Sequence, residues 1–307
     1  MRILLLGAQG QLGQTFIAHG GLAARGELIA ASRDGNVPAG TRGVQADIAD
    51  ESALRAVLDD VNPDLIVNAA AYTAVDKAET DEATAMAVNG HAPGILGRWA
   101  ATRGAGVIHY STDYVFPGDA QAPYVPDAAT GPQGAYGRSK LAGELALRSS
   151  GANHLILRTA WVYSAVGHNF LKTMLRLGRE RDELKVVADQ RGTPTTTTLI
   201  VEGSIVAIDR FVEKSNRPAL TGTYHLTASG ETTWHGFAEA IFDEAVTEGV
   251  LARRPVVHPI GTSDFPTPAR RPTYSVLDNR SFAETFRHTL PAWRDGLHDI
   301  VHSLASQ

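Results

Sequence analysis

Residues 3–13 read Ile3-Leu4-Leu5-Leu6-Gly7-Ala8-Gln9-Gly10-Gln11-Leu12-Gly13, an apolar run followed by glycines at G-x-x-G-x-x-G spacing. The apolar run predicts a buried strand, and a helical pattern begins after Gly10. A tight turn needs glycine, a pyrophosphate needs close approach of the backbone, and the amides at a helix N-terminus attract anions. Because the glycines lie between a strand and a helix, we interpret them as a dinucleotide-binding loop and not as a turn without a ligand.

Short apolar runs alternate with helical patterns through the first half of the chain. Strands that are covered on both faces are continuous apolar runs, so the alternation predicts an α/β fold with a Rossmann-type, doubly wound parallel sheet. We expect strands at Ile3–Leu6, Leu28–Ala31, Leu65–Val67, Val107–Ser111 and His154–Leu157. We expect helices at Leu12–Ala18, Glu51–Leu58, Glu82–Thr102 and Tyr136–Arg148.

The pattern changes after about Arg158, and we interpret the second half as a smaller, interleaved C-terminal substrate lobe. Its expected elements are a helix at Asn169–Arg181, a strand at Leu184–Val187, a helix at Leu199–Phe211, a strand at Thr223–Leu226 and a helix at Trp234–Val246. We assign residues 1–164 and about 194–226 to a dinucleotide-binding domain, and residues 165–193 and 227–307 to the substrate-binding lobe.

Composition excludes several classes of protein. The 307 residues carry 28 Lys+Arg and 33 Asp+Glu, a net charge of −5, so the chain has no global electrostatic attraction to nucleic acid. The chain has no cysteine, which excludes disulfides, thiolate catalysis and Cys-ligated zinc and suits a cytoplasmic location. Its apolar runs are far too short to span a membrane. We therefore expect a small-molecule partner, and neither a nucleic acid nor a membrane.

The end of the second predicted strand indicates the cofactor. An acid at this position binds a ribose 2′-hydroxyl, whereas a basic residue accommodates a 2′-phosphate. Here Ser32 and Arg33 precede Asp34, which favours NADPH over NADH, while Asp34 keeps the use of NADH open. The alternative is that these are charges of a solvated loop. Asp47 could contact the adenine, or it could belong to the N-cap region of the next helix.

Tyr136 and Lys140 form a Y-x-x-x-K pair at the start of a helical pattern. Residues four apart lie on one helix face, and a nearby ammonium lowers the pKa of a phenol, whose ordinary value is near ~10. Tyr136 could therefore give a proton to a carbonyl oxygen that receives a hydride. Thr112 ends the fourth predicted strand, where ligands of open α/β sheets bind, and could bond the same oxygen. The alternatives are that Tyr136 and Lys140 only lie on the surface of a helix, and that Thr112 only caps the end of a strand.

These motifs have the order and spacing of an extended short-chain dehydrogenase/reductase. Over nearly the whole chain, the sequence resembles the dTDP-4-dehydrorhamnose reductase family. The resemblance rests on Gly7–Gly13, Val67–Glu79, Ser111–Phe116, Tyr136–Glu144, Arg158–Tyr163 and Pro266–Pro272. The last two stretches are the more specific, because few other reductases share them.

The resemblance implies that the chain reduces the C4 keto group of dTDP-4-dehydro-β-L-rhamnose with NADPH or NADH, which gives dTDP-L-rhamnose. With the residues discussed above, it completes a cofactor site of Gly7, Gly10, Gln11, Leu12, Gly13, Ser32, Arg33, Asp47, Ile48, Ala71, Tyr72, Thr73, Tyr110, Tyr136 and Lys140. It places Thr112, Asp113 and Trp161 at the sugar. Without the resemblance, Trp161 and Tyr110 would be interpreted as core residues.

Arg270 and Arg271 have a physical interpretation of their own. A nucleotide sugar carries a diphosphate, and guanidinium groups offer planar, paired donors that suit phosphate oxygens. The prolines of Pro266–Pro272 would stiffen the loop that presents them, whereas the alternative is an exposed basic loop. Asn169, at the start of a predicted helix, is a second diphosphate candidate on weaker grounds.

The chain departs from the family at the positions where a metal ion would bind. Some family members bind Mg²⁺ through acidic residues at a dimer contact, and hard cations prefer carboxylates. The corresponding positions here are Thr15, Thr195–Thr198 and Leu290–Trp293, which hold no acid. We therefore expect no metal site and no metal-linked dimerisation, while a homodimer of another kind stays open.

Two other functions compete with reduction. One is another nucleotide-sugar epimerase or reductase; a 4,6-dehydratase is disfavoured because Tyr114 follows Thr112 and Asp113 where an acid would be needed. The other is a non-catalytic regulatory homologue, which would have no need to keep Tyr136, Lys140 and Thr112 together.

Overall fold

The chain folds around a seven-stranded parallel sheet, in a computed structural model that describes residues 1–213 and 215–306. The strand order is β3-β2-β1-β4-β5-β6-β11, so the winding reverses beside β1, as in a doubly wound sheet. The strands are β1 (Arg2–Leu6), β2 (Glu27–Ser32), β3 (Arg42–Gln45), β4 (Leu65–Asn68), β5 (Gly106–Thr112), β6 (Asn153–Thr159) and β11 (Gly222–His225). The predicted fold class is confirmed, and so are the five predicted strands of the first half.

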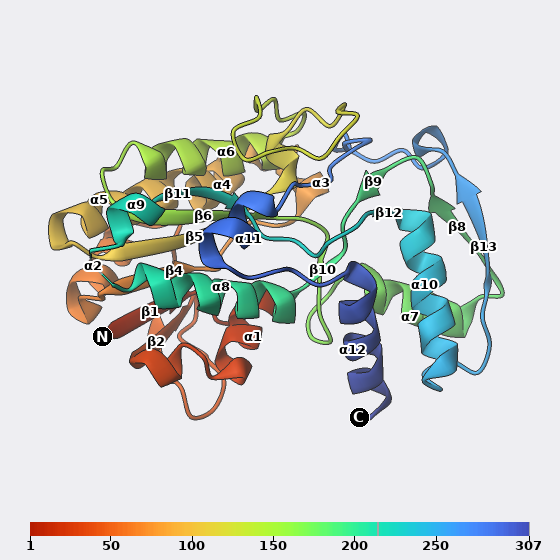
Figure 1. Cartoon of the computed structure of the whole chain (residues 1–307), viewed down its shortest axis with the longest axis horizontal. Coiled ribbons are helices and arrows are strands. Elements are labelled where there is room, and N and C mark those ends of the chain that lie inside the picture. Colours follow the sequence, from red (N-terminus) through yellow and green to blue (C-terminus); the bar gives the residue numbers. More distant parts are fainter. Residues whose placement is uncertain (214, 307) are drawn as a thin grey trace.

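Helices cover both faces of the sheet, as Figure 1 shows. One face carries α1 (Gln11–His19) and α8 (Thr197–Phe211), and the other carries α2 (Glu51–Val61), α5 (Ala92–Arg103) and α6 (Ala135–Arg148). On β1, Ile3 and Leu5 point towards α1 and α8, while Leu4 and Leu6 point towards α2 and α5. All four side chains are fully buried, which is why this strand is an unbroken apolar run in the sequence.

One helix that was predicted as continuous is interrupted in the structure. The stretch Glu82–Thr102 is not one continuous α-helix but α4 (Glu82–Ala85), a π-helical turn (Met86–His91) and α5. A π turn inserts an extra residue into the helical hydrogen-bond pattern and frequently marks a functional site. Its buried residues, Asn89 and Gly90, face α6, so the turn lies beside the helix that carries Tyr136.

The smaller lobe is built from the later part of the chain. Its main elements are α7 (Phe170–Glu180), β8 (Glu183–Val187), α10 (Trp234–Thr247), β13 (Val256–Ile260) and α12 (Trp293–Ala305), with β8 parallel to β13. Short elements complete the described chain: β7 (Val162–Tyr163), β9 (Arg191–Gly192), β10 (Thr195–Thr196), β12 (Thr232–Thr233), α3 (Val75–Ala78), α9 (Arg217–Leu220) and α11 (Arg280–Phe286). Because α8 and β11 return to the sheet between elements of this lobe, the lobe is interleaved. The domain boundaries given above stay a prediction.

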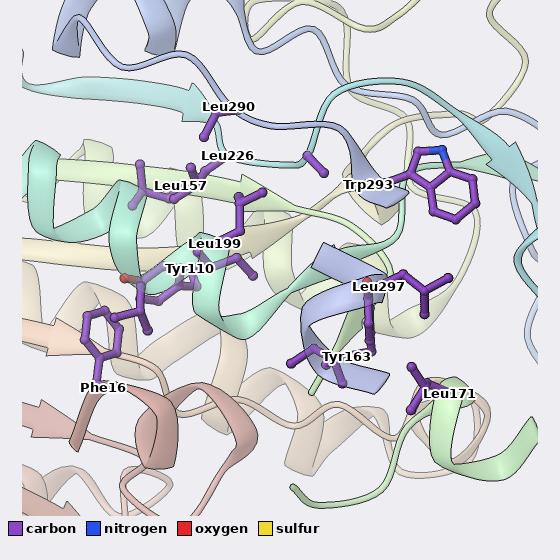
Figure 2. Packing of buried hydrophobic residues seen from close by; sticks show 14 of the residues in the cluster. Phe16, Tyr110, Leu157, Tyr163, Leu171, Leu199, Leu226, Leu290, Trp293 and Leu297 are labelled. Carbon is purple, nitrogen blue, oxygen red and sulfur yellow. The ribbon is translucent and has the colours of Figure 1, made fainter. Parts of the chain in front are cut away.

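A single apolar core connects the sheet with the smaller lobe. Figure 2 shows Phe16 and Tyr110 on the sheet side, Leu199 of α8 between them and the lobe, and Trp293 and Leu297 of α12 on the far side. Each fully buried side chain of this kind contributes roughly 1.5–3 kcal/mol. The two lobes therefore support each other through a continuous hydrophobic contact. No helix in the described part of the chain is long and apolar enough to cross a membrane.

Candidate active site

The glycine loop is shaped for close approach of its backbone. Gly7 has φ of +85°, and a Cβ there would lie 2.6 Å from the backbone nitrogen of Ala70. A Cβ on Gly13 would overlap the carbonyl oxygen of Gly7, and the amide of Gly10 donates to that same oxygen at 3.0 Å. Gly10 is the N-cap of α1, so the first backbone N–H groups of this helix, which have no partner within the helix, lie at the loop. These glycines are therefore required by the geometry that anion binding needs.

Gln11 joins the loop to the start of the smaller lobe. Its Oε1 accepts hydrogen bonds from Ser164 Oγ and from Asn169 Nδ2, each at 2.8 Å. Asn169 is also the N-cap of α7 and donates to the carbonyl oxygen of Ser164 at 2.8 Å. Asn169 thus holds the glycine loop, a role that the sequence analysis missed. Its contact with a diphosphate stays a prediction and would require some of these bonds to be exchanged.

The residues after β2 are folded against the glycine loop. Ser32, which is buried, donates to Asp34 Oδ1 at 2.9 Å, and Gln9 Nε2 donates to the same oxygen at 2.9 Å. Hydrogen bonds from Asn36, Ser32 and Gln9 hold the pKa of Asp34 well below its usual range. The Ser32 hydroxyl is therefore engaged within the loop, and an ionised Asp34 lies beside Gln9. Arg33 is exposed. Because the Ser32 hydroxyl is occupied and Asp34 is charged, only Arg33 supports the expected preference for NADPH over NADH.

The stretch Ala71–Thr73 follows β4 and is fixed by Asn89 of the π turn. Asn89 Oδ1 accepts from the amide of Tyr72 at 2.9 Å, and its Nδ2 donates to the Tyr72 carbonyl at 3.0 Å. Nδ2 also donates to Ser139 Oγ of α6 at 3.1 Å. One buried amide therefore connects the predicted cofactor stretch to the catalytic helix. Sequence reasoning missed Asn89, although an Asn-Gly pair inside an apolar helical pattern was its signal.

Tyr136 and Lys140 lie on successive turns of α6, beside the carboxyl end of β5. The Lys140 ammonium donates to the carbonyl oxygen of Tyr110 at 2.6 Å and is 2% exposed. Thr112 ends β5 and donates to Asp113 Oδ1 at 2.9 Å. The structure therefore brings the three residues of the predicted catalytic set together. Tyr110 itself is a core residue whose hydroxyl pairs with Ser204 Oγ at 2.6 Å, so only its backbone faces Lys140.

The electrostatics of the site differ from the expectation. Burial raises the pKa of Tyr136 to about 12; hydrogen bonding to Thr112 opposes this rise, and the Asp113 charge adds to it. The predicted lowering by Lys140 is not found, because burial dominates and the ammonium is directed to the Tyr110 carbonyl. Burial lowers the pKa of Lys140 to about 8, with the Glu144 charge opposing. At neutral pH the phenol therefore keeps its proton and the amine stays mostly charged.

The carboxylate of Asp113 is buried beside Tyr136 and Lys140. Burial raises its pKa to about 6, while hydrogen bonds from Ser275 and Thr112 oppose the rise. Oδ2 has no hydrogen-bond partner among the described residues, although the side chain is 2% exposed. Leaving such an acceptor unpaired costs about 1–3 kcal/mol. A hydroxyl of a bound sugar would remove that cost.

Trp161 connects the end of the sheet to the smaller lobe. Its φ is +46°, in the left-handed region that residues other than glycine rarely adopt. The indole stacks on Trp234 of α10, with ring centroids 3.6 Å apart and planes within 5°. Strained backbone of this kind persists where the surroundings enforce it and is frequent at ligand sites. Packing of Trp161 on the sugar stays a prediction.

The Pro/Arg loop docks on the stretch that follows β4. Arg271 Nη2 donates to Asp76 Oδ2 at 2.7 Å, and the amide of Ala269 donates to Asp76 Oδ1 at 3.1 Å. Asp76 is a residue that sequence reasoning missed, since 195 positions separate it from Arg271. Arg270 is exposed. A diphosphate bound by Arg271 would compete with Asp76 for one guanidinium group.

Comparison with known proteins supplies the family. A family model described as the RmlD substrate binding domain matches residues 1–306. A dTDP-4-dehydrorhamnose reductase of Burkholderia thailandensis is 44% identical over all of both chains. The chain belongs to the dTDP-4-dehydrorhamnose reductase family.

Two solved structures of dTDP-4-dehydrorhamnose reductases have the same architecture. That of Clostridium acetobutylicum has a TM-score of 0.87 at 35% identity and covers 99% of each chain. That of Bacillus anthracis, which is in complex with NADP, has a TM-score of 0.84 at 32% identity and covers 97% of this chain and 98% of the other.

Two of the three stretches at which the resemblance implies a metal in some family members, Thr15 and Thr195–Thr198, meet in this chain. Thr15 Oγ1 donates to Thr197 Oγ1 at 2.8 Å, and Gly296 of α12 packs against Thr196. The residues that meet there supply hydroxyls in place of carboxylates. The absence of Mg²⁺ from this place stays a prediction that chelation can test.

Proposed function

We propose that this chain reduces the C4 keto group of dTDP-4-dehydro-β-L-rhamnose with a nicotinamide cofactor and so forms dTDP-L-rhamnose. The single observation that carries the proposal is the meeting of Tyr136, Lys140 and Thr112 at the carboxyl end of β5, in a chain that matches this reductase family over its whole length. The chain is thus an oxidoreductase of dTDP-rhamnose biosynthesis.

The residues present fit a dinucleotide. The backbone of Gly7 lies where a Cβ would strike Ala70, and the amides of α1 open at the loop. Pyrophosphate would be held there, with Ala71–Thr73 beside it and Lys140 at the nicotinamide ribose. When bound, the reduced nicotinamide supplies the hydride for C4. Both NADPH and NADH fit the residues after β2, with NADPH preferred through Arg33.

Tyr136 supplies the proton. Its phenol is protonated at neutral pH because burial raises the pKa to about 12. As C4 gains hydride, negative charge develops on O4, and the phenolic proton moves to O4 to complete the alcohol. For Thr112 to bond the same oxygen, its hydroxyl proton would leave Asp113 Oδ1, to which it donates at 2.9 Å. The buried Lys140 ammonium, which donates to the Tyr110 carbonyl, would have to turn towards the phenolate to stabilise it.

The substrate is held on both sides of the reacting carbon. Asp113 offers its unpaired Oδ2 to a sugar hydroxyl, and Trp161 packs its ring against the sugar. Arg270 and Arg271 bind the diphosphate, with Asn169 as a further donor. The nucleotide sugar is the expected partner. A cytoplasmic location, the absence of a nucleic-acid partner and a homodimeric state stay predictions.

The deciding experiment is NADPH oxidation with the dTDP-4-keto-6-deoxy-L-sugar, which is generated in situ by the enzymes that precede this step. Stoichiometric oxidation with formation of dTDP-L-rhamnose is expected. An epimerase would convert the sugar without consuming added NADPH, and a regulatory homologue would do neither. Either outcome would refute the proposal.

A further inference from the structure

Two helices of the smaller lobe place two carboxylates opposite two imidazoles. Glu244 and the C-cap Glu248 lie one turn apart at the end of α10, and His298 and His302 lie one turn apart on α12. His298 Nδ1 is 2.6 Å from Glu244 Oε1, and His302 Nδ1 is 2.7 Å from Glu248 Oε2. The two imidazole rings are 5.9 Å apart, with 25° between their planes. None of the four residues belongs to the catalytic, cofactor or substrate set.

The spacing of three of these groups approaches that of a metal-ligand set, and His302 lies next to the three through its contact with Glu248. One ligand atom each from Glu244, Glu248 and His298 lies within 4.8 Å of the others. Tetrahedral zinc binds nitrogen and oxygen at about 2.0–2.2 Å, which places its ligand atoms roughly 3.3 Å apart. The side chain of His298 is 56% exposed and that of His302 is 64% exposed, so small rotamer changes can close the difference.

Ion pairing alone explains less of the arrangement. One histidine and one glutamate suffice for an ion pair, and exposed pairs contribute little to stability. Here both helices repeat their ligand type after four residues, which puts each pair on one helix face. Imidazole together with carboxylate suits Zn²⁺, Ni²⁺ or Cu²⁺, whereas Mg²⁺ and Ca²⁺ take oxygen ligands. The ligand set therefore differs in kind from the all-oxygen sites that Mg²⁺ and Ca²⁺ prefer.

We propose that Glu244, Glu248, His298 and His302 bind one divalent transition-metal ion, with Zn²⁺ as the expected ion, and that this ion fastens α12 to α10. α12 also inserts Trp293 and Leu297 into the shared core (Figure 2), so the ion stabilises the packing of the smaller lobe. Its role is structural, since no catalytic residue belongs to either helix.

Protons compete with the metal at this site. A metal needs the neutral imidazole, so metal binding at this site releases any protons that the imidazoles carry.

The test uses the full-length protein without a purification tag, stripped of metal. Titration with Zn²⁺ by calorimetry should give one ion per chain and a proton release that is visible as a dependence on buffer ionisation enthalpy. Co²⁺ in place of Zn²⁺ should give the visible absorption of a tetrahedral site. Zinc at about a hundredfold excess over Kd should raise Tm measurably, because only the folded chain has the site.

His298→Ala and His302→Ala each remove a direct ligand, so each should weaken Zn²⁺ binding by at least the roughly 10- to 100-fold that loss of an outer-shell partner costs. The matched control is His258→Ala, which removes a single exposed His–Glu pair, with His258 Nε2 3.2 Å from Glu183 Oε2. It should leave zinc affinity unchanged. Glu244→Gln provides a second loss of a ligand should a histidine variant fold poorly, as circular dichroism would show. The proposal is overturned if the wild type fails to bind stoichiometric zinc, or if His258→Ala weakens binding as much as His298→Ala.

Discussion

Replacing Tyr136 with phenylalanine removes one hydroxyl from the first turn of α6 and leaves the ring in place. The ring packs edge-on against Tyr114, with centroids 5.6 Å apart and planes at 76°. That contact needs no hydroxyl, so Tyr136→Phe should fold as the wild type does. The change therefore isolates the proton that the phenol supplies.

The size of the loss follows from the surroundings of the phenol. Burial raises the pKa of Tyr136 to about 12, so nearly every molecule carries the proton at neutral pH. Lys140 and Thr112 are buried beside it, while the Tyr136 ring itself is partly buried. A positioned acid contributes about 10²- to 10⁴-fold, which corresponds to about 3–5 kcal/mol of barrier. We expect kcat of Tyr136→Phe to fall within that range.

The assay is the initial rate of NADPH oxidation at saturating sugar. Tyr114→Phe is the matched control, because it removes a neighbouring phenol that donates no proton, and its kcat should stay near that of the wild type. Thr112→Val loses one hydrogen bond and should fall by about tenfold. If Tyr136→Phe keeps kcat within a few-fold of wild type, or if Tyr114→Phe falls as far, the proton has another source.

The other predictions concern cofactor, substrate and metal. Arg33→Ala should lower the ratio of kcat/KM for NADPH over NADH by about tenfold, since it removes one exposed charge-assisted contact; an unchanged ratio would assign the choice to Asp34. Arg271→Ala should raise KM for the nucleotide sugar and leave the Kd of the cofactor unchanged, and an equal loss of both would show that its pair with Asp76 shapes the whole site. Because burial raises the pKa of Asp113 to about 6, its carboxylate is lost as the pH falls through that value and KM for the sugar should rise there; Asp113→Asn should give a high KM that no longer changes between pH 5 and 8, and a pH dependence kept in that variant would exclude Asp113. Treatment with EDTA should leave the rate unchanged, and a loss restored by Mg²⁺ would reveal ligands other than those considered above.

The sheet was predictable where burial is complete. Ile3–Leu6 of β1 and Leu65–Val67 of β4 are unbroken apolar runs because helices cover both faces of these strands. β3 and β13 were missed because they are mostly exposed, and exposure removes the apolar signal. α12 carries an apolar face of Trp293, Leu297, Ile300 and Val301 at helical spacing, so its signal was present in the sequence and was overlooked.

The site was predictable where its chemistry is local. Four positions separate Tyr136 from Lys140, and the glycine loop spans seven residues, so spacing alone exposed both. Asp76 and Arg271 meet only because the Pro/Arg loop docks on the short helix α3, and no local pattern in either segment predicts that contact. The pKa of Tyr136 also required the fold, since it depends on burial, which spacing does not show.

The distribution of unpaired polar atoms links the fold to the reaction. Thr112 and Thr159 are partners in the register of β5 and β6, at the carboxyl end where ligands of such sheets bind. Near them, Asp113 Oδ2 and Thr159 Oγ1 are buried and have no hydrogen-bond partner among the described residues. Each unpaired group costs about 1–3 kcal/mol of stability. Packing alone does not explain why such groups lie beside Tyr136. We expect the sugar of the substrate to bond these atoms and so to offset that cost. In that case, part of the binding energy is already fixed by the positions of groups that the fold leaves unsatisfied.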